Sequence, residues 1–225
     1  MRIDIVSANP KILECSLKNG LTSRAIEKKK IKIFIHNLRD YAEGKYRQID
    51  DLPYGGGSGM ILKPEPVFRC VEKLKKERYY DESIYFSPQG KKFDQKTANE
   101  FSLKKNVLII CGHYKGIDER VIKKLTTREI SIGDYVLSCG DIAAYVFADA
   151  VARLIPGVLG DGESAITDSF QVETGFDYPQ YTRPEVYKRM RVPKVLMSGN
   201  HKEIKKWRET KAKSKYKKVF KTNKN

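Results

Sequence analysis

Three short apolar runs in this chain each end in a polar loop that contains glycine, and this repeated pattern limits the possible folds more than any other feature. The runs and their loops occupy residues 84–90, 107–120 and 131–141. Short, continuously apolar runs are typical of central strands in parallel sheets. Loops that follow such strands meet at one edge of the sheet, where α/β proteins bind their ligands. We therefore predict an α/β fold with one pocket at the ends of these three strands.

The rest of the sequence alternates between strand and helix patterns, as a sheet covered by helices requires. Isoleucines at positions 31, 33 and 35 alternate with other residues, which is typical of a half-buried strand. Further strands are expected at residues 3–6 and 107–111, and helices at 66–76 and 95–103.

An alanine-rich helix is predicted from Ile142 to Leu154, directly after the third loop. Asp141 is a good candidate to cap its N-terminus, and Pro156-Gly157 ends it. The five alanines of this helix leave little side-chain bulk, so another element must pack closely against it. That element is either a neighbour in the same core or a second subunit.

The 225-residue chain carries a net charge of +16, and the excess is concentrated near the C-terminus, where residues 199–225 hold eleven Lys or Arg and two Glu. Such a concentration is typical of proteins that bind a polyanion, although a solvated lysine-rich tail has the same composition. Trp207 and Tyr216 lie among these lysines. Their rings can stack on RNA bases, and Trp207 equally fits an anchor that packs a helix on its own domain.

Four cysteines stand singly, without a C-x-x-C pair, which favours reduced thiols in a cytosol over disulfides or a zinc site. No apolar run reaches the roughly 18 residues of a membrane-spanning helix. The first ten residues lack the long apolar centre of a signal peptide. We therefore expect a cytoplasmic protein with no membrane partner.

Eight motifs, taken in their order along the chain, resemble those of the bacterial tRNA (guanine-N(1)-)-methyltransferases. Three of them are the loops described above, SPQGKKFDQ, GHYKGIDERV and SIGDYVLSCGD. The others are YGGGSGM, RLIPGVLG, DSF, YTRPEVY and VPKVLMSGNHKEIKKWR. The resemblance extends from about Met1 to Arg208, and the family belongs to the SPOUT class of AdoMet-dependent RNA methyltransferases.

The resemblance implies a parallel-sheet domain tied in a trefoil knot over residues 1–158, a flexible linker at 159–167 and a small basic helical domain at 168–225 that binds tRNA. It also implies a homodimer whose active site is shared between the two chains. The implied reaction is methyl transfer from AdoMet to N(1) of the guanosine at position 37 of tRNA, on the 3′ side of the anticodon. The anticodon stem-loop is then the partner.

The resemblance places AdoMet in the three loops, where backbone groups hold most of it. The cofactor-binding residues carried over are Tyr85, Phe86, Ser87, Pro88, Gly112, Tyr114, Ile132, Gly133, Asp134, Tyr135, Val136, Leu137 and Gly140. The family also places the glycine loop at residues 54–59 beside the target base. Its residues alone fit a flexible turn, because no Gly-Lys-Ser/Thr follows them.

Methylation at N(1) of guanine requires removal of its proton and stabilisation of negative charge on the neighbouring oxygen. The resemblance assigns the first role to Asp168, as general base, and the second to Arg153, whose guanidinium suits an oxyanion. By local sequence alone, Asp168 also fits a helix cap or a solvated loop. Arg153 also fits the favourable position of a cation at a helix C-terminus.

Several positions depart from the family pattern, among them Leu52 and Ser58 in the glycine loop, and two others bear on the chemistry. Lys115 stands where the family usually has an acidic residue, so the resemblance leaves open whether magnesium takes part. Cys139 stands where the family usually has a glycine, which introduces a thiol into the cofactor loop. We interpret the chain as a divergent but intact enzyme. The alternative is a non-catalytic, basic RNA-binding protein on a methyltransferase-like scaffold.

Overall fold

The computed structural model describes residues 1–159, 170 and 176–221, with side chains as far as residue 216. The chain divides into two compact units, Met1–Gly160 and Asp161–Asn225. The predicted linker therefore lies almost wholly outside the described residues. The domain boundaries taken from the resemblance, and the role given to each domain, stay a prediction.

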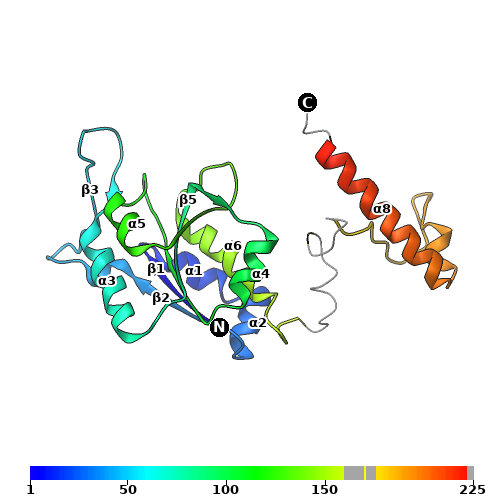
Figure 1. Ribbon diagram of the computed structural model, residues 1–225, viewed down its shortest axis with the longest axis horizontal. Coiled ribbons are helices and arrows are strands. Elements are labelled where there is room, and N and C mark those ends of the chain that lie inside the picture. The colour runs from blue at the N-terminus through cyan, green and yellow to red at the C-terminus, as the bar shows by residue number, and fades with distance from the viewer. Residues whose placement is uncertain (160–169, 171–175, 222–225) are drawn as a thin grey trace. The chain divides into compact units, whose positions relative to one another are not determined.

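The larger unit is built on a five-stranded sheet in which every neighbouring pair of strands is parallel (Figure 1). In spatial order the strands are β2 (Lys32–Asn37), β1 (Arg2–Ser7), β6 (Asn106–Ile110), β5 (Glu82–Lys92) and β7 (Arg128–Ser131). The predicted α/β fold with a parallel sheet is confirmed. Because β6, β5 and β7 are adjacent, the loops that follow them emerge at the same edge of the sheet.

Helices cover both faces of this sheet (Figure 1). One face packs against α1 (Pro10–Ser16), α2 (Gly20–Glu27), α4 (Gln95–Ser102) and α6 (Gly140–Ala152). The other face packs against the 3-10 helix η1 (Leu38–Tyr41), α3 (Pro64–Glu77) and α5 (Glu119–Leu125). Alternate side chains of one strand therefore enter different cores: Val107 and Ile109 of β6 face one, and Leu108 faces the other. This double burial explains the continuously apolar runs.

A short antiparallel pair, β3 (Asp50–Asp51) and β4 (Ile61–Leu62), holds the two ends of the glycine loop together. Leu62 also forms a bridge with Ile117, which ties this pair to the loop after β6.

The predicted helices at 66–76 and 95–103 are confirmed as α3 and α4, but two details around the third loop were wrong. The apolar run after Ser131 is not a strand, since β7 ends there and Val136 is 85% exposed. Helix α6 begins at Gly140, so Asp141 lies in its first turn, and the N-cap is Cys139. The cap prediction failed because the Asp141 side chain turns into the core, as described below.

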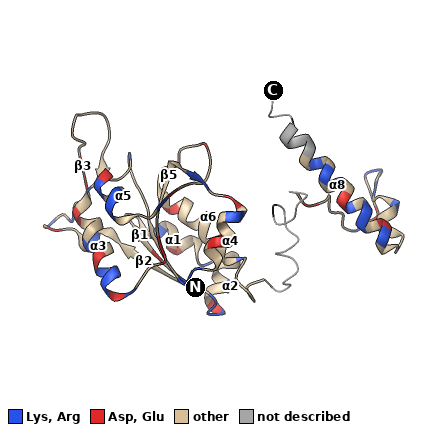
Figure 2. Cartoon of the chain, viewed as in Figure 1, with Lys and Arg blue, Asp and Glu red and all other residues tan. Residues whose placement is uncertain are grey.

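The small unit contains an antiparallel hairpin as well as helices. Its elements are β8 (Val186–Tyr187), β9 (Met190–Arg191), the 3-10 helix η2 (Lys194–Met197) and α8 (His201–Lys221). The segment expected to be a basic tail is therefore helical as far as Lys221, with Lys and Arg along its length (Figure 2). Trp207 lies with its ring centroid 6.3 Å from that of Tyr181, which confirms the role of a helix anchor.

Candidate active site

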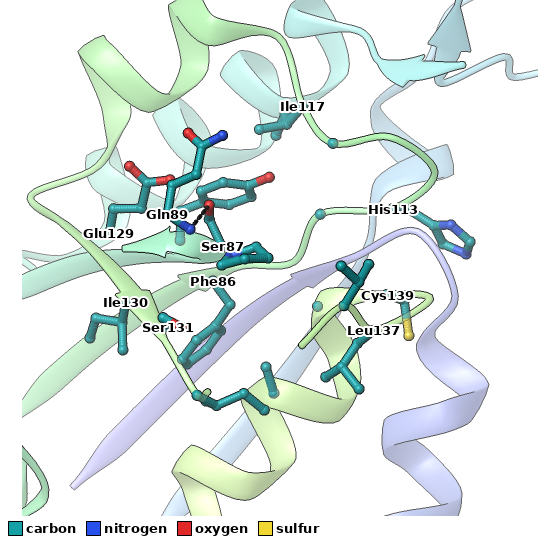
Figure 3. Close-up of a pocket in the computed structure, with 18 of the residues that line it drawn as sticks. Phe86, Ser87, Gln89, His113, Ile117, Glu129, Ile130, Ser131, Leu137 and Cys139 are labelled. Atoms are coloured by element: carbon teal, nitrogen blue, oxygen red, sulfur yellow. Dashed lines mark hydrogen bonds between the residues drawn. The ribbon is translucent and has the colours of Figure 1, made fainter. Parts of the chain in front are cut away.

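A pocket of about 450 Å³ opens at the carboxyl ends of β5, β6 and β7 (Figure 3). Residues of the three predicted loops form most of its wall, and Ala143 of α6 adds to it. The prediction of one pocket at these three strand ends is therefore correct in its location. A volume of this size falls within the range of small-molecule sites.

The first loop is a four-residue excursion within β5. Phe86 and Lys91 both pair with Ile130 of β7, so residues 87–90 interrupt the regular pairing between them. The Ser87 hydroxyl accepts a hydrogen bond from the backbone N–H of Gln89 at 3.1 Å and so fixes the turn (Figure 3). Side chains and backbone of this excursion face the pocket.

The second loop, after β6, turns sharply enough to need unusual backbone angles. Tyr114 has φ 59° and Gly116 has φ 138°, and His113 pairs with Gly116 across the turn. Gly112 leaves no room for a side chain, because a Cβ there would lie 2.9 Å from the hydroxyl oxygen of Tyr85. A glycine at this point therefore lets the Tyr85 ring and any ligand approach the backbone.

The third loop returns from β7 and docks on the second. The Gly140 N–H donates to the Gly112 carbonyl at 2.8 Å, and a Cβ on Gly140 would lie 2.8 Å from the Gly112 nitrogen. Cys139 also forms a bridge with His113. The two loops therefore form one continuous wall of backbone, and only glycine fits at position 140.

A buried polar contact anchors this wall to the sheet. The Asp141 carboxylate is fully buried, and its Oδ1 accepts a hydrogen bond from Ser7 Oγ, at the end of β1, at 2.5 Å. Burial raises the pKa of Asp141, and hydrogen bonds from Ser7 and Cys139 oppose that shift. Burial likewise raises the pKa of Cys111 well above its usual range, with Asp141 adding to the shift. Sequence reasoning missed the role of Ser7, which no local pattern marks.

Twelve of the thirteen predicted cofactor-binding residues line the pocket. The exception is Asp134, whose exposed carboxylate forms an ion pair with Lys92 at 2.7 Å. The structure adds Gln89, Glu119 and Glu129, which sequence reasoning did not single out. Gln89 belongs to the first motif and Glu119, at the start of α5, belongs to the second, so both could have been included. Glu129 enters from β7, outside the motifs, and carries no local signal.

The glycine loop lies beside the second loop. The backbone N–H of Lys115 donates to the Met60 carbonyl at 3.0 Å, and a Cβ on Gly59 would lie 3.0 Å from Lys115 Cγ. The loop residues Gly55, Gly56, Gly57 and Gly59 all have positive φ. Lys115 itself is exposed and lines the pocket.

Of the two predicted catalytic residues, only Arg153 is described, and it does not line this pocket. Arg153 is the C-cap of α6, and Gly140, at the other end of this helix, lines the pocket. At 1.5 Å per residue the two ends are about 20 Å apart. Asp168 lies outside the described residues.

Within residues 1–159, 170 and 176–221, His, Cys, Asp and Glu side chains form no group of three or more that could hold a metal ion. A helix with the length and hydrophobicity needed to cross a bilayer is likewise not found in the described part of the chain.

Comparison with known proteins places this pocket in a family. The model of the family described as tRNA (Guanine-1)-methyltransferase TrmD matches residues 1–221. The tRNA (guanine-N(1)-)-methyltransferase of Chlorobaculum tepidum is 55% identical over 212 residues, which cover 94% of this chain and 92% of that protein. The enzyme of the same name from Bacteroides fragilis strain YCH46 is 52% identical over 207 residues, 92% of each chain.

A solved structure agrees with the sequence comparisons. The crystal structure of tRNA (m1G37) methyltransferase from Aquifex aeolicus superposes with a TM-score of 0.80 at 37% identity, and the match covers 97% of this chain and 92% of that chain. The parallel sheet, the loops at its edge and the small basic unit all fall within the matched length. The chain therefore belongs to the tRNA (guanine-1)-methyltransferase family.

Proposed function

We propose that this protein transfers a methyl group from AdoMet to N(1) of the guanosine at position 37 of tRNA, on the 3′ side of the anticodon. The observation that carries the proposal is the convergence of three predicted loops on one pocket. It is supported by the 55% identity to a tRNA (guanine-N(1)-)-methyltransferase over 94% of the chain. A cytoplasmic location goes with this substrate.

The pocket fits AdoMet in size and in chemistry. Its wall at Gly112 and Gly140 carries no side chain, so the cofactor can approach the backbone of the loops. Loop N–H and C=O groups other than the pair that joins these two glycines can then bond to adenine and to the amino-acid end of the cofactor. The carboxylates of Glu119 and Glu129 can accept hydrogen bonds from ribose hydroxyls or the ammonium group. AdoMet, when bound, supplies an electrophilic methyl group, while the chain's own residues orient the acceptor and move its proton.

Asp168 acts as the general base that takes the proton from N(1), and Arg153 stabilises the negative charge that develops on the adjacent guanine oxygen. A carboxylate and a guanidinium are matched to these two tasks, since one accepts a proton and the other donates a planar pair of hydrogen bonds.

The separation of Arg153 from the pocket within one chain supports a homodimer, in which one subunit supplies Arg153 and Asp168 to the pocket of the other. The outer surface of α6 fits such an interface. Ile142 and Val146, one turn apart, are 40% and 42% exposed, whereas Ala144 and Ala148 are buried in the core. The alanines therefore pack within their own domain, and the larger side chains are left to face a partner.

The small unit binds the tRNA anticodon arm. Between Phe176 and Lys221 the sequence holds fifteen Lys or Arg and four Asp or Glu. A charge of this density favours phosphate contacts that are independent of sequence. The larger unit then reads the target base, because phosphate contacts alone position RNA without identifying it.

Lys115 bears on the question of magnesium. Its ammonium group at the rim of the pocket repels a divalent cation, and it can pair with an RNA phosphate or with a carboxylate of the cofactor. We therefore expect methyl transfer to depend only weakly on magnesium, and Lys115→Glu to increase that dependence while it weakens tRNA binding.

One assay tests the proposal and its alternative together. Purified protein, labelled AdoMet and bulk tRNA should give labelled tRNA in which digestion locates the methyl group on N(1) of guanosine 37. A basic RNA-binding protein without catalytic function would bind tRNA, but it would not bind AdoMet and would not transfer the label. Calorimetric titration with AdoMet alone separates the two, since only an enzyme needs the loop pocket.

A further inference from the structure

The small unit has a pocket of its own, distinct from the loop pocket of the larger unit. It has a volume of about 630 Å³. One side is the extended segment from Tyr178 to Glu185, and the other side is formed by η2 and the first half of α8. The two sides are joined next to the hairpin, where the backbone N–H of Val192 donates a hydrogen bond to the Glu185 carbonyl at 2.9 Å.

Flat rings and a guanidinium line this pocket. The Arg208 guanidinium lies over the ring of Tyr178 at 4.6 Å from its centroid, and both residues line the cavity. Tyr181 also lines it, is 51% exposed, and packs on Trp207 behind it. Surfaces of this kind bind the faces of unpaired nucleobases by stacking and cation–π contact.

The remaining walls complete a site for a base. Val192, Leu196 and Ile204 are half-buried and give the pocket an apolar floor. Gln180, Thr182 and Glu185 stand at the rim, where an amide, a hydroxyl and a carboxylate can bond to the edge of a base. Arg183 adds a cation beside them, which suits the phosphate of the same nucleotide.

The charge around this pocket favours RNA over a protein partner. The segment from Phe176 to Lys221 has fifteen basic and four acidic residues, and Lys and Arg positions recur along the part of α8 that Figure 2 colours. A peptide would have to be strongly acidic to approach this surface, whereas an RNA loop always carries both the phosphates and the flat rings that Tyr181 and Arg208 are placed to stack on.

We infer that this pocket binds one unpaired nucleobase of the RNA substrate, stacked on Tyr181 and Arg208 with its phosphate on Arg183. The inference rests on the proposed function for the identity of the RNA. The small unit would then contact one base of the RNA in addition to its sequence-independent phosphate contacts. RNA affinity would therefore depend on whether an unpaired loop nucleotide can enter the pocket.

The single tryptophan of the chain reports on this pocket directly. Trp207 packs on Tyr181, so a base that stacks on Tyr181 should change its fluorescence, whereas filling of the loop pocket in the larger unit should not. The titrant is an RNA hairpin with the anticodon stem and loop, together with a series of hairpins in which each loop nucleotide in turn is abasic. All titrations use the full chain.

Two pocket variants have matched controls in the same unit. Tyr181→Leu and Arg208→Gln change the pocket, whereas Tyr187→Leu and Arg189→Gln make the same chemical changes on the exposed hairpin. Stacking on one aromatic side chain contributes about tenfold or more in affinity. Each pocket variant should therefore weaken RNA binding by about tenfold relative to its control. Thermal unfolding with circular dichroism verifies that Tyr181→Leu is folded.

The abasic series gives the decisive result. One loop position other than the methylated guanosine should lose affinity in the wild type but not in Tyr181→Leu, because the contact is already absent there. Equal losses at all positions, or equal effects of pocket and control variants, in a protein that still methylates tRNA would overturn this inference alone. A wild-type protein that binds no RNA would overturn the inference and the proposed function together.

Discussion

The larger unit buries its side chains in two cores on either side of a sheet, whereas in the described part of the small unit only Ala212 is buried. The small unit instead exposes large apolar side chains, among them Tyr187 at 59% and Met190 at 65%. The charges differ as well: residues 1–160 hold 28 Lys or Arg and 20 Asp or Glu, against fifteen and four in residues 176–221.

This difference indicates a division of work. A pocket formed by interlocked loops on a double core keeps its shape before the ligand arrives, which is the requirement for catalysis. An open, basic unit with exposed rings offers charge and stacking surface instead, which suits contact with a polyanion. Changes in the two units should therefore have separable effects on cofactor and on RNA.

The largest effect is expected from the proposed general base, whose task is proton transfer rather than binding. Asp168→Asn should lower the rate of methyl transfer by about a hundredfold or more, because an amide cannot take the proton from N(1). AdoMet and tRNA affinities should stay near wild-type values. Single-turnover kinetics at saturating tRNA measure the effect, and near wild-type turnover would remove Asp168 from the mechanism.

Gly140→Ala tests whether the larger unit is as rigid as the comparison requires. The added Cβ would lie 2.8 Å from the Gly112 nitrogen and 3.1 Å from Cys111 Cα, and neither backbone atom can move alone. Overpacking of this kind costs about 1–3 kcal/mol, so AdoMet should bind about ten- to a hundredfold more weakly while tRNA binding changes little.

Gly44→Ala is the converse variant, since Gly44 has positive φ and open space around it, whereas Gly140 has the clash without a positive φ. It measures the effect of backbone strain without a clash. If Gly140→Ala bound AdoMet as tightly as the wild type, the loop wall would be adaptable and the contrast between the units would weaken. Calorimetric titration of both variants decides.

Acid should destabilise the larger unit first. Asp4 is fully buried in β1, and burial opposes its ionisation. Hydrogen bonds from His36 at 2.7 Å and from Arg2 at 2.6 Å stabilise the ionised carboxylate more than burial destabilises it. They lower the pKa of Asp4 to about 2. Arg78 and Tyr80 also face this carboxylate.

Because the folded-state pKa is lowered, the stabilisation is present above the unfolded value near 4 and is lost as the pH falls towards 2. The loss should be about 2 kcal/mol. Denaturant unfolding followed between pH 5 and pH 2 measures it. Asp4→Asn should be less stable at pH 5 and should show a flatter pH dependence; a slope equal to that of the wild type would assign acid sensitivity to other groups.

Much of the larger unit could be predicted because its signals are local. Apolar runs marked β5 and β6, and twelve of thirteen residues proposed for the cofactor line one pocket. The errors have a physical cause in distant contacts. Asp141 was predicted to be a cap from its neighbours in sequence, but its partner is Ser7, 134 positions away.

The small unit was harder to predict for the opposite reason. Lysines every few residues gave residues 209–225 the composition of a solvated tail, yet Ala212 is buried and Tyr216 packs on Phe176, which stabilises the helix to Lys221. The hairpin of β8 and β9 turns through Lys188 and Arg189, both with positive φ, where the usual Asn-Gly signal is missing.

The smallest effect is expected from charge on α8, and it isolates the small unit. Deletion of the helix end would also remove Ala212 and Tyr216, so substitution is the cleaner test. Changing Lys206, Lys213 and Lys215 to Gln removes three exposed cations and keeps the helix, because Lys and Gln have similar helix propensities. Each lost phosphate contact lowers the slope of log affinity against log salt by about 0.7–0.9.

The triple variant should therefore bind tRNA about tenfold more weakly at low salt and approach the wild type as salt rises, with AdoMet affinity unchanged. Lys28, Lys29 and Lys32, changed to Gln together, are a matched control, because they are exposed cations in the larger unit near the start of β2, far from the strand ends that form the pocket. If log tRNA affinity fell with log salt at the same slope in both triple variants, cations of the two units would contribute equally to tRNA binding. The proposal that the small unit supplies most of the phosphate contacts would then be wrong.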